Sequence, residues 1–303
     1  MHAFDPHALE CLAAIVEEGG FQRAAVRLSI TQSAVSQRLR TLEAQAGTVL
    51  IVRSRPLRAT AAGRLLLRHA MQLRLLRADL DHDLHGLAPG ASSAHEEERM
   101  SIAVNADSIA TWALPALTPL VAAGLPLEII ADDQDFTHVW LREGQVLGCV
   151  TALPQALRGC KVVPLGVMRY VAVARPDYAA ALAPLGLTAH TARAMAFIAF
   201  NRKDELQARF VRKACRLQRL VLNQRFVPSA EGQVQAVLAG WGASVVPELQ
   251  VRHLLGSGEL VNLSPGNVLP VTLYWHCWNL NSGVLDALTR ALTEAAAQAL
   301  APG

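Results

Sequence analysis

The sequence has few cysteines, and none of them forms a metal-binding or disulfide pattern. Five cysteines are spread over 303 residues, and no two of them make a C-x-x-C pair. An odd number without paired spacing argues against a disulfide framework and against a zinc site built on cysteine pairs. The cysteine usage therefore predicts reduced, mostly buried thiols, as in a cytoplasmic protein.

Long hydrophobic runs are also absent. No uncharged apolar stretch reaches the roughly 18 residues that a membrane-spanning helix needs. The first residues, "MHAFDPHALE", lack the basic and apolar segments of a signal peptide. We therefore expect no membrane association and a cytoplasmic location, with 52% hydrophobic residues to fill more than one core.

The common signatures of enzymes and metal sites are missing as well. The sequence contains no Walker loop, no nucleophile elbow and no dinucleotide fingerprint. His82 and His85 are one helical turn apart, but no further histidine or cysteine completes a metal site. The sequence thus predicts a protein that is not an enzyme and that uses no cofactor and no metal.

Lysine is scarce, and the positive charge lies at the N-terminus. Residues 1–80 contain eleven arginines and six acidic residues, a balance of +5, whereas the whole chain carries only +3. The remainder of the chain is therefore close to −2. Such an asymmetry is typical of a domain that contacts nucleic-acid phosphates.

The segment "AAVRLSITQSAVSQRLRTLEAQAG" (24–47) predicts a helix that begins after Thr31, a good N-cap residue. Val35, Leu39 and Leu42 recur at helical spacing and form its apolar face. The opposite face carries glutamine, serine and arginine, although an ordinary solvated face is usually rich in Glu and Lys. The preceding "FQRAAVRLS" predicts a second short helix, joined to the first by only a few residues.

Two helices connected so tightly indicate a helix-turn-helix, whose second helix enters the DNA major groove. Glutamine pairs with adenine, arginine pairs with guanine or phosphate, and serine serves either. A helical hairpin that only packs, with its polar face in water, stays open as an alternative. The candidate DNA contacts in this segment are Thr31, Gln32, Ser33, Ser36, Gln37, Arg38 and Arg40.

The next segment, "VLIVRSRPLRATAAG", combines a short β-prone run with three arginines around a proline. This pattern is typical of the wing of a winged helix-turn-helix. We therefore add Arg53, Arg55 and Arg58 to the candidate DNA contacts.

A long helix over about residues 59–87 follows the wing. Its leucines repeat every seven residues, which is the spacing of a coiled-coil seam and predicts dimerisation. Packing of this helix against its own domain is the alternative. The seam residues are Leu66, Leu73, Leu80 and Leu87. The Gly-, Pro- and Ser-rich residues 89–99 that follow indicate a hinge.

From Met100 onward, strand and helix patterns alternate, which predicts an α/β domain with largely parallel strands. The expected strands include "SIAVNA", "LEIIA", "VLGCVTA", "YVAVA", "AFIAF", "RLVLN", "ASVVP" and "VTLYWHCW". In such folds a ligand binds at the carboxyl ends of the strands.

Polar residues gather at these strand ends. Asn105 to Ser108 open a helix whose free N–H groups can hold a carboxylate, and Asp132, Asp133 and Asp135 follow the next strand. Simple N-capping by Asp107 and Ser229, and a solvated loop for the acidic residues, are the alternatives. A free basic amino acid would use both an anion site and acidic partners. The candidate effector contacts are Asn105, Asp107, Ser108, Asp133, Thr151, Phe200, Ser229 and Glu231.

Residues 5–64, with "GGFQRAAVRLSITQSAVSQRLRTLE", resemble the N-terminal domain of LysR-type transcriptional regulators. The motifs "SIAVNADSIATWALPAL", "SAEGQVQ", "SGEL" and "LYWH" resemble the ArgP/LysG branch of that family, which senses basic amino acids. The resemblance implies an α+β multidomain chain. Its parts would be a winged helix-turn-helix (1–58), a linker helix (59–88), a hinge (89–99) and a two-lobed effector domain like the periplasmic binding proteins, with lobe I at about 100–165 and 272–303 and lobe II at about 166–271.

The same resemblance implies a transcription regulator that answers to lysine, arginine or both and controls a basic amino acid exporter gene. Its implied partners are a double-stranded DNA operator, a second copy in a homodimer or homotetramer, and RNA polymerase. An origin- or nucleoid-binding inhibitor of replication initiation is the alternative, because this branch is also described as chromosome-initiation inhibitors. A transport receptor would share the α/β fold but would need a signal peptide.

Overall fold

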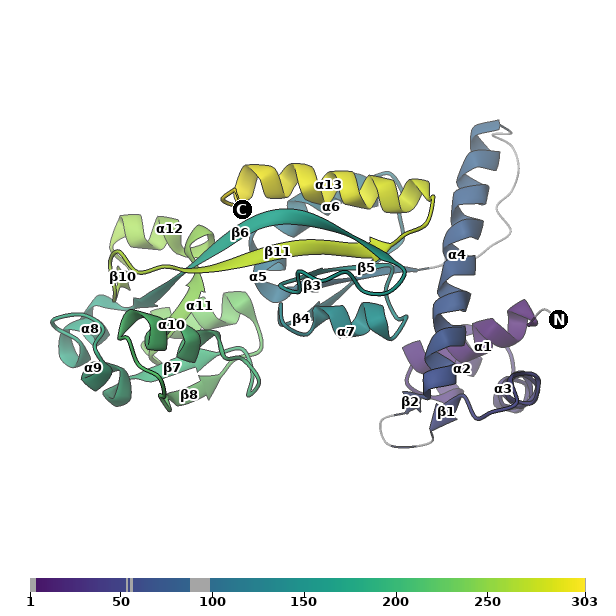
Figure 1. Cartoon of the computed structure of the whole chain (residues 1–303), viewed down its shortest axis with the longest axis horizontal. Coiled ribbons are helices and arrows are strands. Elements are labelled where there is room, and N and C mark those ends of the chain that lie inside the picture. Colours follow the sequence, from purple (N-terminus) through teal and green to yellow (C-terminus); the bar gives the residue numbers. More distant parts are fainter. Residues whose placement is uncertain (1–3, 53, 55–56, 88–98, 303) are drawn as a thin grey trace.

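The computed structural model describes residues 4–52, 54, 57–87 and 99–302, and it divides into an N-terminal head, a long helix and a two-lobed domain (Figure 1). The candidate hinge lies almost entirely outside the described residues. No helix within the described ranges is long and apolar enough to cross a membrane.

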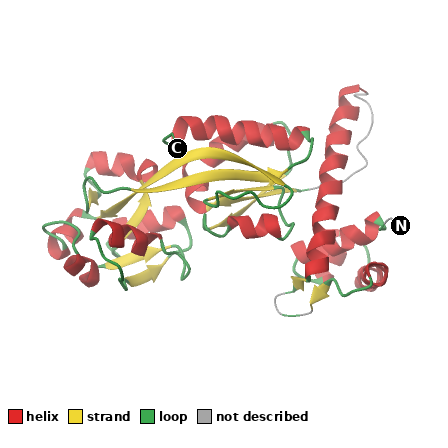
Figure 2. Ribbon diagram, in the orientation of Figure 1, coloured by secondary structure: helices red, strands yellow, loops and turns green. Residues whose placement is uncertain are grey.

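The head is built from α1 (Pro6–Glu17), α2 (Phe21–Arg27) and α3 (Gln32–Ala46), followed by the paired strands β1 (Ile51–Val52) and β2 (Arg58–Ala59). As predicted, α3 begins after Thr31, whose Oγ1 accepts a hydrogen bond from the N–H of Ala34 at 3.2 Å. Figure 2 shows the two strands as a small ribbon beside the helices. The predicted helix-turn-helix and wing are therefore both present.

The apolar face of α3 forms the core of the head. Val35, Leu39 and Leu42 are buried against Leu12 of α1 and Ala24 of α2. The small alanine side chain lets α2 approach closely, and Ser29 adopts a positive φ of 51° in the short connector. The tight turn thus fixes the angle at which α3 is presented.

The long helix α4 (Ala61–Leu87) packs its first half on the head, where Leu67 and Ala70 are buried, whereas Met71 is buried against the core of the effector domain. Of the predicted seam residues, Leu66 and Leu73 are partly buried against the core of the head. At these two leucines the helix therefore follows the alternative, in which it packs against its own domain. Leu80 is exposed, and nothing is described of the Leu87 side chain.

Arg74 of α4 lies buried against the head. Its guanidinium donates to Glu10 Oε2 at 2.6 Å and to Glu17 Oε1 at 2.7 Å, so that it holds two carboxylates of α1. Glu17 also pairs with Arg27. The positive charge of residues 1–80 is thus partly used inside the head and is not all available to DNA.

Helix α4 also contacts the effector domain at two points, Arg68 and Asp79. Arg68 Nη2 donates to the carbonyl of Arg142 at 3.1 Å, and the N–H of Val284 donates to Asp79 Oδ1 at 3.2 Å. Gly144 adopts φ +76°, and a Cβ there would lie within 3.0 Å of the Arg68 backbone. Glycine is required at this close approach.

The effector domain contains one sheet in the order β4-β3-β5-β11-β6-β9-β7-β8, with β10 paired to β6. In lobe I, β3 (Met100–Asn105), β4 (Leu127–Asp132) and β5 (Gly148–Thr151) are parallel and are covered by α6 (Leu114–Ala122), α7 (Thr137–Arg142) and α13 (Gly283–Ala299). In lobe II, β7 (Ala196–Ala199), β8 (Asn223–Phe226) and β9 (Ala243–Pro247) carry α10 (Leu206–Ala214) and α11 (Ala230–Leu238).

Two long strands join the lobes. β6 (Cys160–Ala174) and β11 (Leu269–Trp278) run antiparallel from one lobe into the other (Figure 1). The expectation of largely parallel strands is wrong for β6 and β11, which pair antiparallel with each other and with β9 and β5, because the chain leaves lobe I along β6 and returns to it along β11. Their register shifts between Leu273 and Tyr274, opposite Gly166, close to the two crossing points expected from the sequence.

The strand expected at "RLVLN" (219–223) is wrong in position, since β8 begins only at Asn223. Within this run Leu220 and Leu222 pack on the core of the effector domain, whereas Val221 is 91% exposed, and the segment before Asn223 is not a strand. The helix expected to open at Asn105 to Ser108 is present as α5 (Ala106–Ser108), the π-helical turn Ile109–Ala113 and α6. Four short elements of the described chain were not foreseen: α8 (Pro176–Leu182), α9 (Ala189–Ala194), α12 (Glu248–Ser257) and β10 (Val261–Asn262).

Candidate DNA interface and effector cleft

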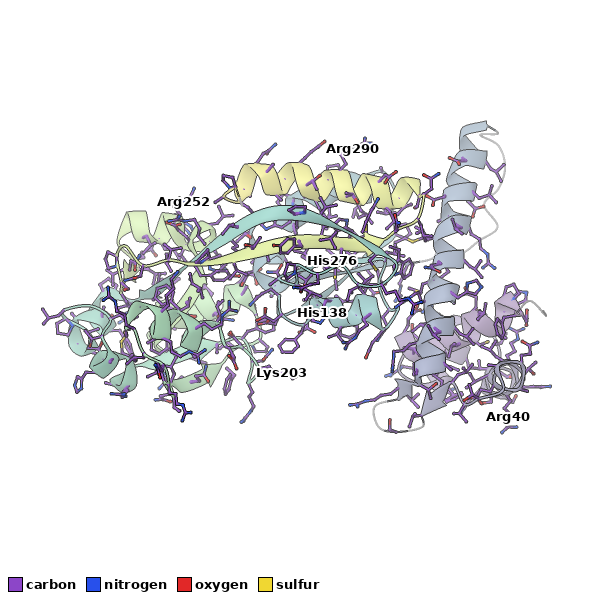
Figure 3. The ribbon with its side chains drawn as sticks, viewed as in Figure 1. Arg40, His138, Lys203, Arg252, His276 and Arg290 are labelled. Atoms are coloured by element: carbon purple, nitrogen blue, oxygen red, sulfur yellow. The ribbon has the colours of Figure 1, made fainter. Side chains whose placement is uncertain are left out.

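The N-terminal end of α3 presents a polar surface to solvent. Gln32, Ser33, Gln37 and Arg40 are exposed, and Ser36 is partly buried beside them. Figure 3 shows Arg40 on α3, at the end of the molecule remote from lobe II. This surface has the donors and acceptors that base edges require, and no described part of the chain covers it.

Other predicted DNA contacts differ in their surroundings. Thr31 is exposed but caps α3, and its hydroxyl lies 2.9 Å from Ser33 Oγ. Arg38 is partly buried, and its side chain reaches the thiol of Cys11. Arg58 is exposed on the wing strand β2, whereas Arg53 and Arg55 lie outside the described residues.

A cleft of about 310 Å³, open to solvent, lies between the two lobes. Lobe I and lobe II each contribute five lining residues, which come from the end of β4, from the segments after β3, β4 and β7, and from α10, α11 and β9. They are Ala106, Asp107, Asp132, Asp133 and Gln134 from lobe I, and Phe200, Asp204, Leu206, Gln233 and Val245 from lobe II. As expected for this type of sheet, the cleft lies at the carboxyl ends of the parallel strands.

Carboxylates dominate this cleft. Tyr170 donates its hydroxyl to Asp107 Oδ2 at 2.6 Å, yet burial, together with the nearby charges of Asp204 and Glu231, raises the pKa of Asp107 to about 6. Burial also raises the pKa of Asp133 to about 7 and that of Asp204 above its usual range. Within the described lining, no lysine, arginine or histidine offsets these charges.

Comparison with known proteins identifies the family. A model described as "Bacterial regulatory helix-turn-helix protein, lysR family" matches residues 6–64, and one described as "LysR substrate binding domain" matches residues 93–301. The chain belongs to the LysR family of transcriptional regulators. The HTH-type transcriptional regulator ArgP of Pseudomonas aeruginosa PAO1 is 40% identical over 305 residues, which cover 99% of this chain and 98% of that protein.

Solved structures agree with this assignment. The crystal structure of ArgP from Mycobacterium tuberculosis has a TM-score of 0.82 at 38% identity and covers all of both chains. Full-length LysG from Corynebacterium glutamicum with bound effector Arg has a TM-score of 0.73 at 36% identity, over 98% of this chain and 100% of that one. The fold predicted for this chain, a DNA-binding head followed by an effector domain, is confirmed.

In this LysR-family chain, three of the predicted effector contacts line the cleft, namely Asp107, Asp133 and Phe200. Thr151 instead donates its hydroxyl to the carbonyl of Gln134 at 2.9 Å. This bond stabilises the acidic turn, the segment after β4 that contains Asp133 and Asp135. Thr151 thus holds this turn in place, and its role as an effector contact stays a prediction.

The other predicted contacts lie around the cleft without lining it. Ser229 caps α11 by accepting from the N–H of Gly232 at 3.0 Å, as the capping alternative proposed. Glu231 is exposed, although its charge is close enough to raise the pKa of Asp107. Asn105 and Ser108 are buried, and their side-chain polar atoms have no hydrogen-bond partner among the residues that the structure describes.

The sequence analysis did not propose Asp204, Gln233 or Gln134 as effector contacts. Asp204 follows the buried strand "AFIA" by five residues, which is the same signal that selected the acidic residues after β4. Gln233 lies in the second turn of α11 and is buried. Only the packing of α11 against β9 shows that it reaches the cleft.

Replacing Gln37 with alanine should reduce discrimination between operator and random DNA by about 1–3 kcal/mol, because an exposed amide in the major groove reads a base edge. Binding to random DNA should hardly change. Gel-shift titrations of both DNAs with the wild type and the variant would measure the ratio.

Arg58→Ala is the matched control on the exposed wing strand. It should weaken both DNAs alike and lower the salt dependence of binding by about one unit, as expected of a phosphate contact. Equal losses on operator and random DNA for Gln37→Ala would contradict its role as a base contact.

Proposed function

We propose that this LysR-family regulator senses a free basic amino acid, lysine or arginine, bound between the two lobes. The observation that supports this proposal most strongly is the concentration of Asp107, Asp133 and Asp204 around one cleft without a positive partner. Buried carboxylates without counter-charges are costly, and a bound cation offsets that cost. The structure of Corynebacterium glutamicum LysG with bound effector Arg agrees with this ligand class.

The α-carboxylate of the amino acid would bind where β3 ends and the helical segment 106–122 begins. Asn105 Nδ2 and Ser108 Oγ are buried there and have no hydrogen-bond partner in the described chain. Unsatisfied buried donors are rare in proteins and often mark a ligand position. The helix dipole adds to the attraction for a negative group.

A thermal-shift screen of the twenty amino acids tests the effector assignment. A ligand that binds only the folded state raises its stability, so lysine and arginine should raise the melting temperature most.

Following the family resemblance, we further propose that the operator lies at a basic amino acid exporter gene. Footprinting on that promoter, with and without lysine, would separate this role from replication-origin binding, which would need no effector response.

We also propose that the outer half of α4 forms a homodimer seam. The leucines of this seam differ in part from those of the predicted heptad. Leu76, Leu80 and Leu84 are 46%, 56% and 47% exposed and recur at helical spacing. Exposed leucines in such a stripe are typical of a coiled-coil partner surface. Pairing there would place two α3 helices on two half-sites, while a tetramer and RNA polymerase contacts stay expectations of the resemblance.

Leu80→Lys should dissociate the dimer, because the seam would have to bury an unpaired charge. Light scattering should show the mass of a single chain with an unchanged response to lysine in the thermal-shift assay. Leu185→Lys is the matched control, since Leu185 is 94% exposed in lobe II. A dimer mass for both variants would place the dimer contact elsewhere.

A further inference from the structure

We propose that Asp204 of lobe II is the residue that makes the cleft selective for a cationic effector, acting opposite Asp107 and Asp133 of lobe I. This proposal rests on the proposed function and deepens it. All three side chains line the same cleft, and Asp204 is the one that lobe II contributes. Asp204 thus lets lobe II take part in recognising a ligand whose other acidic contacts lie on lobe I.

The loop after β7 holds Asp204 in a fixed orientation. Its Oδ2 accepts the N–H of Phe200 at 2.9 Å, and its Oδ1 accepts the N–H of Leu206 at 2.8 Å. The side chain is 8% exposed. Each of these two bonds needs its own acceptor oxygen, and a neutral asparagine would supply only one of them. The loop thus accounts for a side chain with two acceptor oxygens, but neither bond supplies a cation for the negative charge that Asp204 brings to the cleft.

The charged groups nearest to the cleft do not neutralise Asp204. On α10, Arg209 pairs with Asp135 across the lobes at 3.6 Å. In the loop of Asp204 itself, the Lys203 ammonium lies 5.2 Å from the centre of the Phe136 ring, and Figure 3 shows Lys203 at the edge of lobe II. Both cations thus lie against lobe I residues outside the lining, while Asp107, Asp133 and Asp135 all face Asp204 with the same sign.

If the lobes closed over an empty cleft or over a neutral ligand, the carboxylates of the two lobes would come closer together in a partly dehydrated space. A ligand with a second cationic group, the side-chain ammonium of lysine or guanidinium of arginine, removes that repulsion. Because burial raises the pKa of Asp107 to about 6 and that of Asp133 to about 7, these two carboxylates are partly protonated near neutral pH, and a bound cation displaces the protons. Binding of lysine should therefore release protons to the buffer, whereas binding of norleucine should release fewer.

Calorimetry of the full-length protein in two buffers of different ionisation enthalpy measures affinity and proton release together. For Asp204→Asn we expect lysine to bind about 30-fold more weakly or worse. Norleucine should change less than threefold, and fewer protons should be released with lysine. Glu205→Gln is the matched control, because it removes the same charge one residue further on, from a side chain that is 74% exposed. It should leave both affinities and the proton release unchanged.

The outcomes are distinct. If wild type prefers lysine to norleucine and Asp204→Asn keeps the full preference, the role of Asp204 is overturned while the proposed function stands. If wild type shows no preference, the proposed function itself fails. Should the asparagine variant not fold, Asp204→Ser, which keeps an acceptor for the N–H of Leu206, is judged by the same criteria.

Discussion

Replacing Arg74 with methionine should lower the free energy of unfolding by about 3–5 kcal/mol, because it leaves two carboxylates without their shared partner. The Arg74 side chain is only 4% exposed and bonds to Glu10 and Glu17 of α1. Methionine fills similar space, so the loss reports the charge and not a cavity. Chemical denaturation followed by circular dichroism would measure it.

The loss should also depend on pH. Burial opposes ionisation of Glu17, but Arg74 and Arg27 overcome it and hold the pKa of Glu17 below its usual range. A carboxylate with a lowered pKa in the folded state stabilises the fold above its unfolded pKa, about 4.3, and loses that contribution as the pH falls through its folded pKa. Wild type and variant should therefore differ most at pH 7 and converge below about pH 4.

Arg77→Met is the matched control one turn further along α4. Arg77 is 40% exposed on its side chain and lies 3.9 Å from Glu10 Oε1, so its loss should cost less than about 1 kcal/mol. An Arg74→Met variant that loses no more than this control, or that loses the same at every pH, would contradict the role assigned to the buried cluster.

Asp133→Asn should weaken lysine and arginine by about 2–5 kcal/mol, by analogy with buried charge pairs that lose one partner. Asparagine keeps the Oδ1 that accepts the N–H of Asp135 at 2.8 Å, so the acidic turn should hold its shape. Norleucine and citrulline should be affected much less. Thermal-shift titrations with the four ligands would measure these differences.

The same substitution should stabilise the ligand-free protein at alkaline pH. Burial raises the pKa of Asp133 to about 7, so the folded state keeps a proton that the unfolded chain loses above about pH 4. Stability of the wild type therefore falls as the pH rises from about 4 to 7, and asparagine removes that loss. A gain in melting temperature without ligand, combined with a smaller lysine response, is the expected pair of results.

Glu128→Gln is the control for Asp133→Asn. Glu128 is exposed on β4, the strand that Asp133 follows, and it accepts a hydrogen bond from the hydroxyl of Ser101 at 2.7 Å. It should change neither the lysine response nor its pH dependence. If Asp133→Asn behaves like this control, the acidic turn does not contact the effector.

Local patterns were sufficient to predict the head. The cap at Thr31 and the apolar spacing of Val35, Leu39 and Leu42 depend on neighbours within one helix, and the structure confirms both. The long ladder of β6 and β11 depends on residues about a hundred positions apart, which periodicity does not connect. The same limit explains why Leu66 and Leu73 fit a heptad and yet partly pack against the head.

The cleft was predictable where a carboxylate directly follows a strand, as at Asp107 and Asp133. Asp204 carries the same signal, but a short loop separates it from β7. Gln233 gave no signal at all, because a buried glutamine on a helix resembles any other core position until α11 is placed beside β9. The tertiary arrangement, and not local sequence, decides which polar side chains meet.

The central claim is that the interlobe cleft binds a free amino acid with a cationic side chain. Calorimetry of the unmodified full-length protein with lysine, arginine, norleucine and citrulline tests it most directly. We predict that lysine and arginine each bind at least tenfold more tightly than their neutral counterparts, which corresponds to about 1.4 kcal/mol. Equal affinity for lysine and norleucine, and for arginine and citrulline, would contradict it.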